Sequence, residues 1–309
     1  MSGARRRRTG RWGRVSVGVA ALALVLAGSV AAPAGPVGGP AAGPARAAAA
    51  GTTAGTTAGR LPPDATASRA AAAQPAATAQ PAVDLAARGT AADAFARARG
   101  GRTGIVIRDR VTGVTWRNTD AGTAFRAAST VKLGIAVDLL VRGTPLDPAA
   151  RSALTAMLTA SDNAAADRLW ARSGGPAAGA RLAGYGLRDA TGTSRWGSVR
   201  CTPEDLERLV SYALDRTDPA DRATLVGLLR AVVPAQRWGV LGVAGTARPG
   251  AKNGWTPDGD SWAVSTVGFL GPGERYTVAV MTAGPPGSDF LDSVETVTGT
   301  VTTLVLGLR

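Results

Sequence analysis

Two lysines stand out in this chain, because every other basic residue is an arginine. The sequence carries 33 arginines and only two lysines, Lys132 and Lys252. A guanidinium is always protonated, whereas an ammonium can lose its proton when it is desolvated. We therefore expect the two lysines to stand where a proton is exchanged. Histidine is absent, which excludes Ser-His-Asp and Cys-His catalysis.

The first lysine follows a serine at a spacing suited to nucleophilic catalysis. Ser129 lies three residues before Lys132, and a helix from Ser129 to Leu140 would place both on one face. A desolvated Lys132 beside a second cation would have a lowered pKa and could accept the serine proton. This assigns Ser129 as nucleophile and Lys132 as base. A capping serine followed by a solvated lysine is the alternative.

A second polar cluster, Ser161-Asp162-Asn163, follows a predicted helix over residues 148–160. A helical hairpin would return Ser161 to the level of Ser129, because the two helices have similar lengths. The Ser161 hydroxyl could then relay a proton, and the Asn163 amide could hold a substrate carbonyl or Lys132. The alternative is that Ser161 or Asp162 only caps a new helix.

The third cluster, Lys252-Asn253-Gly254-Trp255, lies on a predicted strand. Lys252 could act in catalysis and bind a substrate carboxylate. Gly254 would let a ligand approach the backbone, and the Trp255 N–H could pair with that of Ser129 as an oxyanion hole. We assign Asn253, Gly254 and Trp255 to substrate binding. An ordinary surface lysine at a hairpin entry is the alternative.

Taken in order, the three clusters resemble the motifs of the serine β-lactamase and penicillin-binding protein superfamily, most closely the class A β-lactamases. The matching segments are Ser129-Thr130-Val131-Lys132 for Ser-x-x-Lys, Ser161-Asp162-Asn163 for Ser-Asp-Asn, and Lys252-Asn253-Gly254 for Lys-Thr/Ser-Gly. The resemblance covers residues 83–309. It implies an α/β (α+β) fold, with an antiparallel sheet of about five strands flanked by helices and an all-helical lobe.

The chain departs from the class A pattern after its second motif. Class A enzymes carry a glutamate there, and it activates the water that releases the acyl group. Only four glutamates are present, and none lies between residues 164 and 203. Residues 191–200 look like a shortened version of that loop. The acids available nearby are Asp167 and Asp189.

Three functions remain open at this point. The first is a serine hydrolase or acyltransferase that acts through a Ser129 acyl-enzyme on a peptide, ester or β-lactam-like substrate, including cell-wall peptides. The second is a genuine β-lactamase with an atypical water activator. The third is a non-catalytic module that binds cell-wall peptides. No metal or organic cofactor is implied by any of them.

The hydrophobic pattern predicts a helix, two strands, a helical block, three strands and a final helix. The predicted ranges are 83–99 (helix), 104–109 and 111–118 (strands), 129–230 (helices), a strand through 252, 261–270 and 275–283 (strands), and a helix that ends near 308. One antiparallel sheet with helices on its faces satisfies this order.

The N-terminal region predicts export. Residues 1–31 combine six arginines with an apolar stretch, as in a signal peptide, and transient membrane anchoring by this segment is the alternative. Residues 32–82, rich in Ala, Pro, Gly and Thr, are predicted to be a disordered linker. We expect a secreted, extracytoplasmic protein associated with the cell wall, with a small-molecule or wall-peptide substrate.

Charge and cysteine usage exclude other classes. The net charge is +13, but six arginines of the signal segment account for part of it, and the rest forms no basic run. We therefore expect no nucleic-acid partner. The single cysteine, Cys201, precludes an intrachain disulfide and is expected to be a buried packing residue. Because it lies far from the signal segment, we expect no lipid anchor there.

Overall fold

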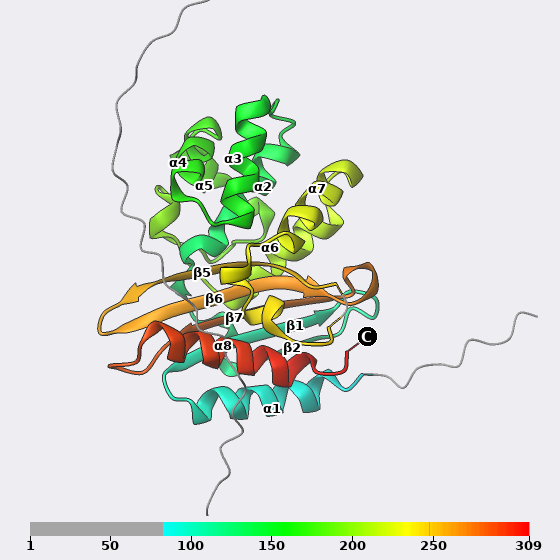
Figure 1. Ribbon diagram of the computed structural model, residues 1–309, viewed down its shortest axis with the longest axis vertical. Coiled ribbons are helices and arrows are strands. Elements are labelled where there is room, and N and C mark those ends of the chain that lie inside the picture. The colour runs from blue at the N-terminus through cyan, green and yellow to red at the C-terminus, as the bar shows by residue number, and fades with distance from the viewer. Residues whose placement is uncertain (1–82, 247, 309) are drawn as a thin grey trace, which may run out of the picture. The chain divides into compact units, whose positions relative to one another are not determined.

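The computed structural model describes residues 83–246 and 248–308 (Figure 1). The predicted signal peptide and linker lie outside the described residues. Apart from two short strands, at 125–126 and 200–201, the order of elements is that expected from the sequence: helix, two strands, a helical block, three strands and a helix. The fold is therefore the expected mixed α/β one.

Five strands form one antiparallel sheet, as predicted, and their order is β2-β1-β7-β6-β5. Their bounds are β1 Arg102–Asp109, β2 Thr115–Arg117, β5 Gly250–Asp258, β6 Ser261–Leu270 and β7 Tyr276–Ala283. β5 is an edge strand, so its outer backbone groups are free of a sheet partner. A separate two-stranded sheet joins β3 Phe125–Arg126 to β4 Arg200–Cys201. Cys201 is fully buried in it, as expected.

Alternate residues of each central strand serve two different cores. Val278 and Val280 of β7 pack with α1 (Leu85–Ala98) and α8 (Phe290–Val305), which lie side by side on one face of the sheet (Figure 1). Ala279 and Met281, which alternate with them along β7, pack with the helical lobe on the other face. This two-sided burial follows from the two-residue side-chain period of a strand.

The helical lobe is built around α2, which is apolar on nearly all sides. The lobe helices are α2 Lys132–Val141, α3 Pro148–Thr159, α4 Asn163–Arg172, α5 Pro176–Arg181, α6 Pro203–Asp215 and α7 Pro219–Arg230. Eight of the ten residues of α2 are buried, the mark of a helix surrounded by protein. Among the described helices, none has the length and apolar character that crossing a membrane requires.

The segment before α2 differs from the prediction that Ser129 opens an α-helix. Residues Ala128–Val131 form a 3₁₀ turn, η2, and α2 begins at Lys132. Ala128 has a φ of 46°, a conformation that a non-glycine residue rarely adopts and that precludes a regular helix there. A 3₁₀ turn has three residues per turn, so Ser129 and Lys132 still lie one above the other.

Candidate active site

The first two predicted motifs meet at the side chain of Lys132. Its Nζ donates hydrogen bonds to the backbone oxygen of Ser161 at 2.6 Å and to Oδ1 of Asn163 at 2.7 Å, and it lies 3.3 Å from Oγ of Ser161. The Lys132 side chain is fully buried. Among the described residues, no hydrogen bond joins Lys132 to Ser129.

Ser161 reaches Lys132 because α3 returns antiparallel to α2, as the helical hairpin predicted. Ser161 has a φ of 59°, which is uncommon for a residue with a side chain. Strained residues of this kind concentrate at functional sites. Asp162 caps α4 by accepting a hydrogen bond from the Ala165 N–H at 2.6 Å. The capping alternative therefore holds for Asp162, while Ser161 and Asn163 contact the lysine.

Lys252 approaches the same serine from β5. Its Nζ lies 3.0 Å from Oγ of Ser161 and donates to the backbone oxygen of Asn253 at 2.8 Å. The side chain is 1% exposed, so it is not the surface lysine of the alternative interpretation. The three predicted motifs are thus joined through the hydroxyl of Ser161.

Burial changes the acidity of both lysines. Burial lowers the pKa of Lys132 to about 8, although the nearby carboxylates of Asp162 and Asp167 favour its charged form. Burial also lowers the pKa of Lys252 well below its usual value, and the charge of Lys132 adds to this effect. The pocket therefore favours neutral amines more than water does.

Gly254 brings β5 into contact with the turn that carries Ser129. A Cβ atom at Gly254 would lie 2.8 Å from the backbone nitrogens of Ser129 and Thr130, so only glycine allows this approach. The Asn253 carbonyl points to the free edge, where it meets Lys252. Backbone groups alternate in direction along an antiparallel strand, so the N–H of Trp255 points to the same edge.

The side chains of Asn253 and Trp255 make their contacts away from the two lysines. Asn253 is 1% exposed and faces the α8 side of the sheet, because it alternates with Lys252. Its Nδ2 donates to the carbonyls of Gln236 and Trp238, at 2.8 and 3.1 Å, and Thr266 donates to its Oδ1 at 2.6 Å.

Asn253 thereby supports the site rather than lining it. Gln236, whose carbonyl it holds, donates from Nε2 to the carbonyl of Ala160, the residue before Ser161. The Trp255 ring packs with Trp238 and Phe290, at centroid distances of 6.0 Å each. Asn253 and Trp255 therefore present only backbone groups to the free edge of β5, where Lys252 contacts the Asn253 carbonyl.

Trp196 is a neighbour of Lys132 that the motifs did not identify. The Lys132 Nζ lies 4.9 Å from the centroid of the Trp196 ring. The indole N–H donates to Oδ1 of Asp167 at 2.7 Å. Trp196 belongs to the short 3₁₀ turn η4 (Trp196–Ser198), which packs against η2. The loop of residues 191–200 thus brings an aromatic ring to Lys132.

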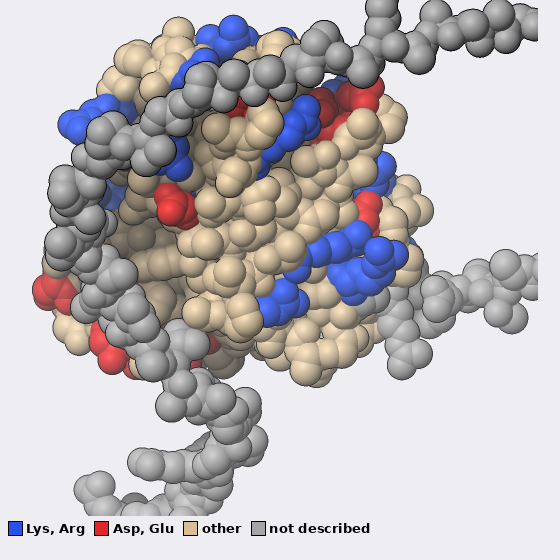
Figure 2. Space-filling model, turned by 45° about the horizontal axis from the view of Figure 1, so that its top comes forward, with Lys and Arg blue, Asp and Glu red and all other residues tan. Residues whose placement is uncertain are grey.

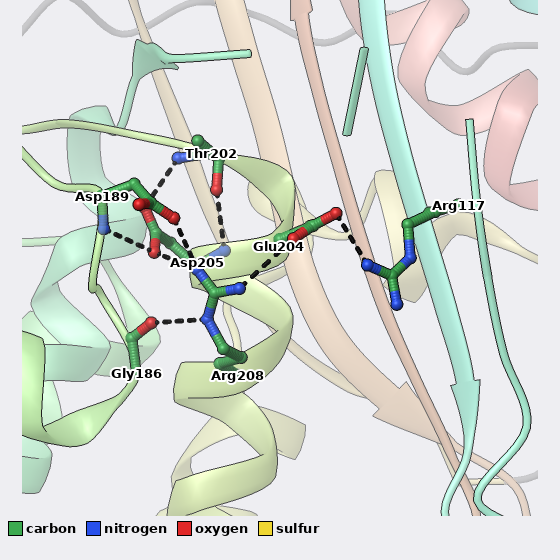
Figure 3. Close-up of polar contacts among 7 residues, drawn as sticks. All are labelled: Arg117, Gly186, Asp189, Thr202, Glu204, Asp205 and Arg208. Carbon is green, nitrogen blue, oxygen red and sulfur yellow. Dashed lines mark hydrogen bonds and ion pairs between the residues drawn. The ribbon is translucent and has the colours of Figure 1, made fainter. Parts of the chain in front are cut away.

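Asp189, the other acid considered for this loop, is bound elsewhere (Figure 3). Its carboxylate pairs with Arg208 at 3.0 Å, and its backbone N–H donates to Asp205. Asp205 also forms a capping box with Thr202 at the start of α6. Asp189 therefore anchors the loop to α6. Within the described residues, no cluster of Cys, Asp and Glu could hold a metal ion.

The basic residues at the surface are arginines, whereas the two lysines of the candidate site are buried. Figure 2 shows basic and acidic patches, some of them side by side, around a broad area of other residues on the face drawn. Because both lysines are buried, the basic surface there is arginine. Lysine is thus confined to the interior of the candidate site.

Solved structures with similar folds identify the fold of this protein. The class A β-lactamase of the last common ancestor of Gram-negative bacteria aligns with a TM-score of 0.61, at 22% identity, over 72% of this chain and 100% of that one. The β-lactamase of Sphaerobacter thermophilus aligns with a TM-score of 0.60, at 23% identity, over 74% and 99%. The fold is that of the serine β-lactamase superfamily, as the motifs implied.

Curated sequences identify the family to which the chain belongs. Proteins named "Putative lipoprotein LppW" from Mycobacterium tuberculosis and Mycobacterium bovis are 31% identical over 226 residues, which cover 68% of this chain and 71% of theirs. The chain belongs to the LppW family. No protein-family model matches it.

Proposed function

We propose that the protein is an exported serine hydrolase or acyltransferase that works through an acyl-enzyme on Ser129. One observation carries this proposal: two buried lysines from distant motifs both contact the hydroxyl of Ser161, next to the turn that carries Ser129. Burying two amines is costly. A packing role would not require such an arrangement, whereas proton transfer does.

Acylation would use one lysine as base and one hydroxyl as relay. Neutral Lys132 takes the proton of Ser129, whose Oγ bonds to the substrate carbonyl carbon while the carbonyl electron pair moves to oxygen. Collapse of this intermediate breaks the bond to the leaving nitrogen or oxygen. That atom receives the proton from Lys132 through Ser161, and an ester of Ser129 remains.

The backbone would stabilise the negative oxygen of the intermediate. Ser129 lies in the turn that β5 touches at Gly254, and the Trp255 N–H points to the free edge of β5. Two N–H groups aimed at one oxygen form an oxyanion hole, and losing one such donor raises the activation free energy by about 3–4 kcal/mol. A substrate carboxylate beside Lys252 would favour its protonated form.

Release of the acyl group is the step for which the chain is poorly equipped. No glutamate lies between residues 164 and 203. Asp189 is paired with Arg208, and Asp167 accepts the indole N–H of Trp196. We therefore propose a long-lived acyl-enzyme, with transfer to an amine or slow hydrolysis as its fate. Peptides, esters and β-lactam-like amides are the substrates proposed.

Localisation is part of the proposal. The arginine-rich start followed by an apolar stretch supports export, and the relatives are named as lipoproteins, which suggests an extracytoplasmic site. We propose that the protein acts outside the cytoplasm, where cell-wall peptides are available. Fractionation of cells that express a tagged full-length chain would test this, and recovery in the cytoplasm alone would contradict it.

Intact-mass measurement after incubation with a penicillin tests the acyl-enzyme. A stable adduct on the wild-type chain, absent from Ser129→Ala, is the expected result. Rapid penicillin consumption without an adduct would instead indicate a genuine β-lactamase with another water activator. If penicillins, activated esters and D-amino-acid peptides all fail to form an adduct or turn over, the proposal is wrong, and a peptide-binding module remains.

A further inference from the structure

We propose that Trp196 is a positioning residue for Lys132, that Asp167 holds Trp196 in place, and that the indole keeps water away from the lysine amine. This inference rests on the proposed function only in assigning Lys132 as the base. The contact between the Trp196 ring and the Lys132 amine does not depend on the reaction. It gives the shortened loop a role in acylation where class A enzymes use their loop for deacylation.

The contacts of the indole connect Lys132 to Asp167. The ring centroid lies 4.9 Å from the Lys132 Nζ, within the range of a cation–π contact. The ring N–H lies 2.7 Å from Oδ1 of Asp167. A hydrogen bond to a carboxylate fixes the orientation of the ring. Trp196 therefore has one fixed face toward the amine.

The helix α4 supplies two of the contacts that hold the amine in place. Asn163 and Asp167 are four residues apart, so they lie on one face of the helix. Asn163 accepts a hydrogen bond from Lys132 directly, and Asp167 acts through Trp196. Asn163 thus contacts the amine itself, and Trp196 links the amine to Asp167 one turn further along α4.

The indole has two opposite effects on the amine. Its ring face stabilises the ammonium, whereas its bulk excludes water and so favours the neutral form. Burial is the largest influence on the pKa of Lys132, and we take the indole to act on the amine mainly by excluding water. The charges that act on the pKa of Lys132 are those of Asp162 and Asp167, and the charge of Lys132 in turn lowers the pKa of Lys252.

Because the chain has only two lysines, a direct measurement is feasible. Lysine labelled with ¹³C at Cε gives two NMR signals, which Lys252→Arg assigns. We expect Trp196→Ala to raise the Lys132 titration midpoint by about one pH unit. Trp196→Phe, which keeps a ring but no N–H, should raise it less. Trp262→Ala, a tryptophan on β6 that packs with Phe290, is the matched control and should leave it unchanged.

Variants of Asp167 separate its hydrogen bond from its charge. Asp167→Asn keeps an oxygen that accepts the indole N–H but loses the charge that favours the ammonium, so the midpoint should fall slightly. Asp167→Ala also frees the ring, so its midpoint should lie above that of Asp167→Asn. Equal midpoints for the two variants, or an unchanged midpoint in Trp196→Ala, would overturn the inference.

Kinetics separate this inference from a role of Asp167 in releasing the acyl group. If Asp167 only positions Trp196, Asp167→Asn should acylate and deacylate within about twofold of wild type. If Asp167 activates water, Asp167→Asn and Asp167→Ala would lose deacylation alike, and the inference would be wrong. Failure of Ser129 to acylate at all would defeat the proposed function, while the NMR titration would still decide the covering of Lys132.

Discussion

Lys132 and Lys252 share one hydrogen-bond partner, because their Nζ atoms lie 3.3 and 3.0 Å from Oγ of Ser161. Two ammonium groups this close repel each other, and both are buried. A hydroxyl can accept from a charged amine and donate to a neutral one. Ser161 can therefore connect one protonated and one neutral lysine, the state that a proton relay requires.

This connection predicts a large kinetic effect for Ser161→Ala. Loss of the relay should slow acylation of Ser129 by about 100-fold or more, the usual contribution of a positioned acid–base group. Folding should be retained, because alanine adopts the positive φ of this position no less readily than serine. The second-order rate of adduct formation, followed by mass spectrometry, is the measurement. An unchanged rate would exclude Ser161 from the proton path.

The pH dependence of acylation should report Lys132. Its pKa is lowered to about 8 by burial, so the neutral amine increases as pH rises through that value. We expect the acylation rate to rise from pH 6 to pH 9, with about a tenth of its maximum at pH 7. Adduct formation with a pH-stable ester across this range is the measurement. A rate that is flat or falls with rising pH would contradict Lys132 as base.

The same burial should make Lys132 a cost to stability. Below pH 8 the amine is protonated in both folded and unfolded chains, so the full penalty applies. Between pH 8 and 10.5 the unfolded chain binds more protons, and the stability of the wild type rises with pH. We expect Lys132→Met to be more stable than wild type at pH 7, by at most about 3 kcal/mol.

Urea unfolding of the two proteins at several pH values would measure this difference. The gap should be largest at pH 7 and shrink toward pH 10. A Lys132→Met protein that is less stable than wild type at pH 7 would show that the hydrogen bonds to Ser161 and Asn163 outweigh the burial of charge.

The motifs were sufficient to locate the lysines and Ser161, because each motif lies at the end of an element whose periodicity is clear. Ser129 and Lys132 share a face in a 3₁₀ turn as they would in an α-helix, so the wrong helix type did not matter. The five-stranded sheet followed from the alternation of its strands. Local sequence therefore carried most of the fold.

Other parts of the site depend on tertiary contacts that local sequence does not encode. Strand alternation predicts that the side chains of Asn253 and Lys252 lie on opposite faces of the sheet. Which of the two faces carries the site depends on how the helical lobe packs, and local sequence does not show that. Nothing in an alanine signals the positive φ of Ala128. Trp196 contacts Lys132 only because η4 packs against η2, across a long stretch of chain. These are long-range relations rather than motifs.

Asn253 is predicted to support the site from the opposite face of the sheet. Asn253→Ala would remove three hydrogen bonds, those to the carbonyls of Gln236 and Trp238 and that from the Thr266 hydroxyl, at a cost of about 2–4 kcal/mol. It should also slow acylation, because Gln236 would no longer hold Ala160 next to Ser161.

Asn118→Ala is the matched control for this variant. Asn118 is also buried and makes three hydrogen bonds, to Ile105, Asp93 and Thr103, remote from the lysines. It should lose similar stability without a change in acylation rate per folded molecule. Chemical denaturation and adduct kinetics would compare the two. Equal rates in both variants would reduce Asn253 to a packing role.

The contact between β5 and the turn that carries Ser129 depends on the missing side chain of Gly254. In Gly254→Ala, the new methyl group would lie 2.8 Å from the backbone nitrogens of Ser129 and Thr130 and 2.9 Å from the oxygen of Ala127. These are backbone atoms that cannot rotate away, so β5 must move from the turn and the two proposed oxyanion N–H groups must separate. We expect acylation to slow by about 100-fold, the cost of losing one such donor.

Gly227→Ala on exposed α7, where a methyl group meets nothing within 4 Å, should instead leave acylation unchanged and stabilise the fold by about 0.5–1 kcal/mol. Equal acylation rates for the two variants would show that Ser129 does not use an oxyanion hole built on β5.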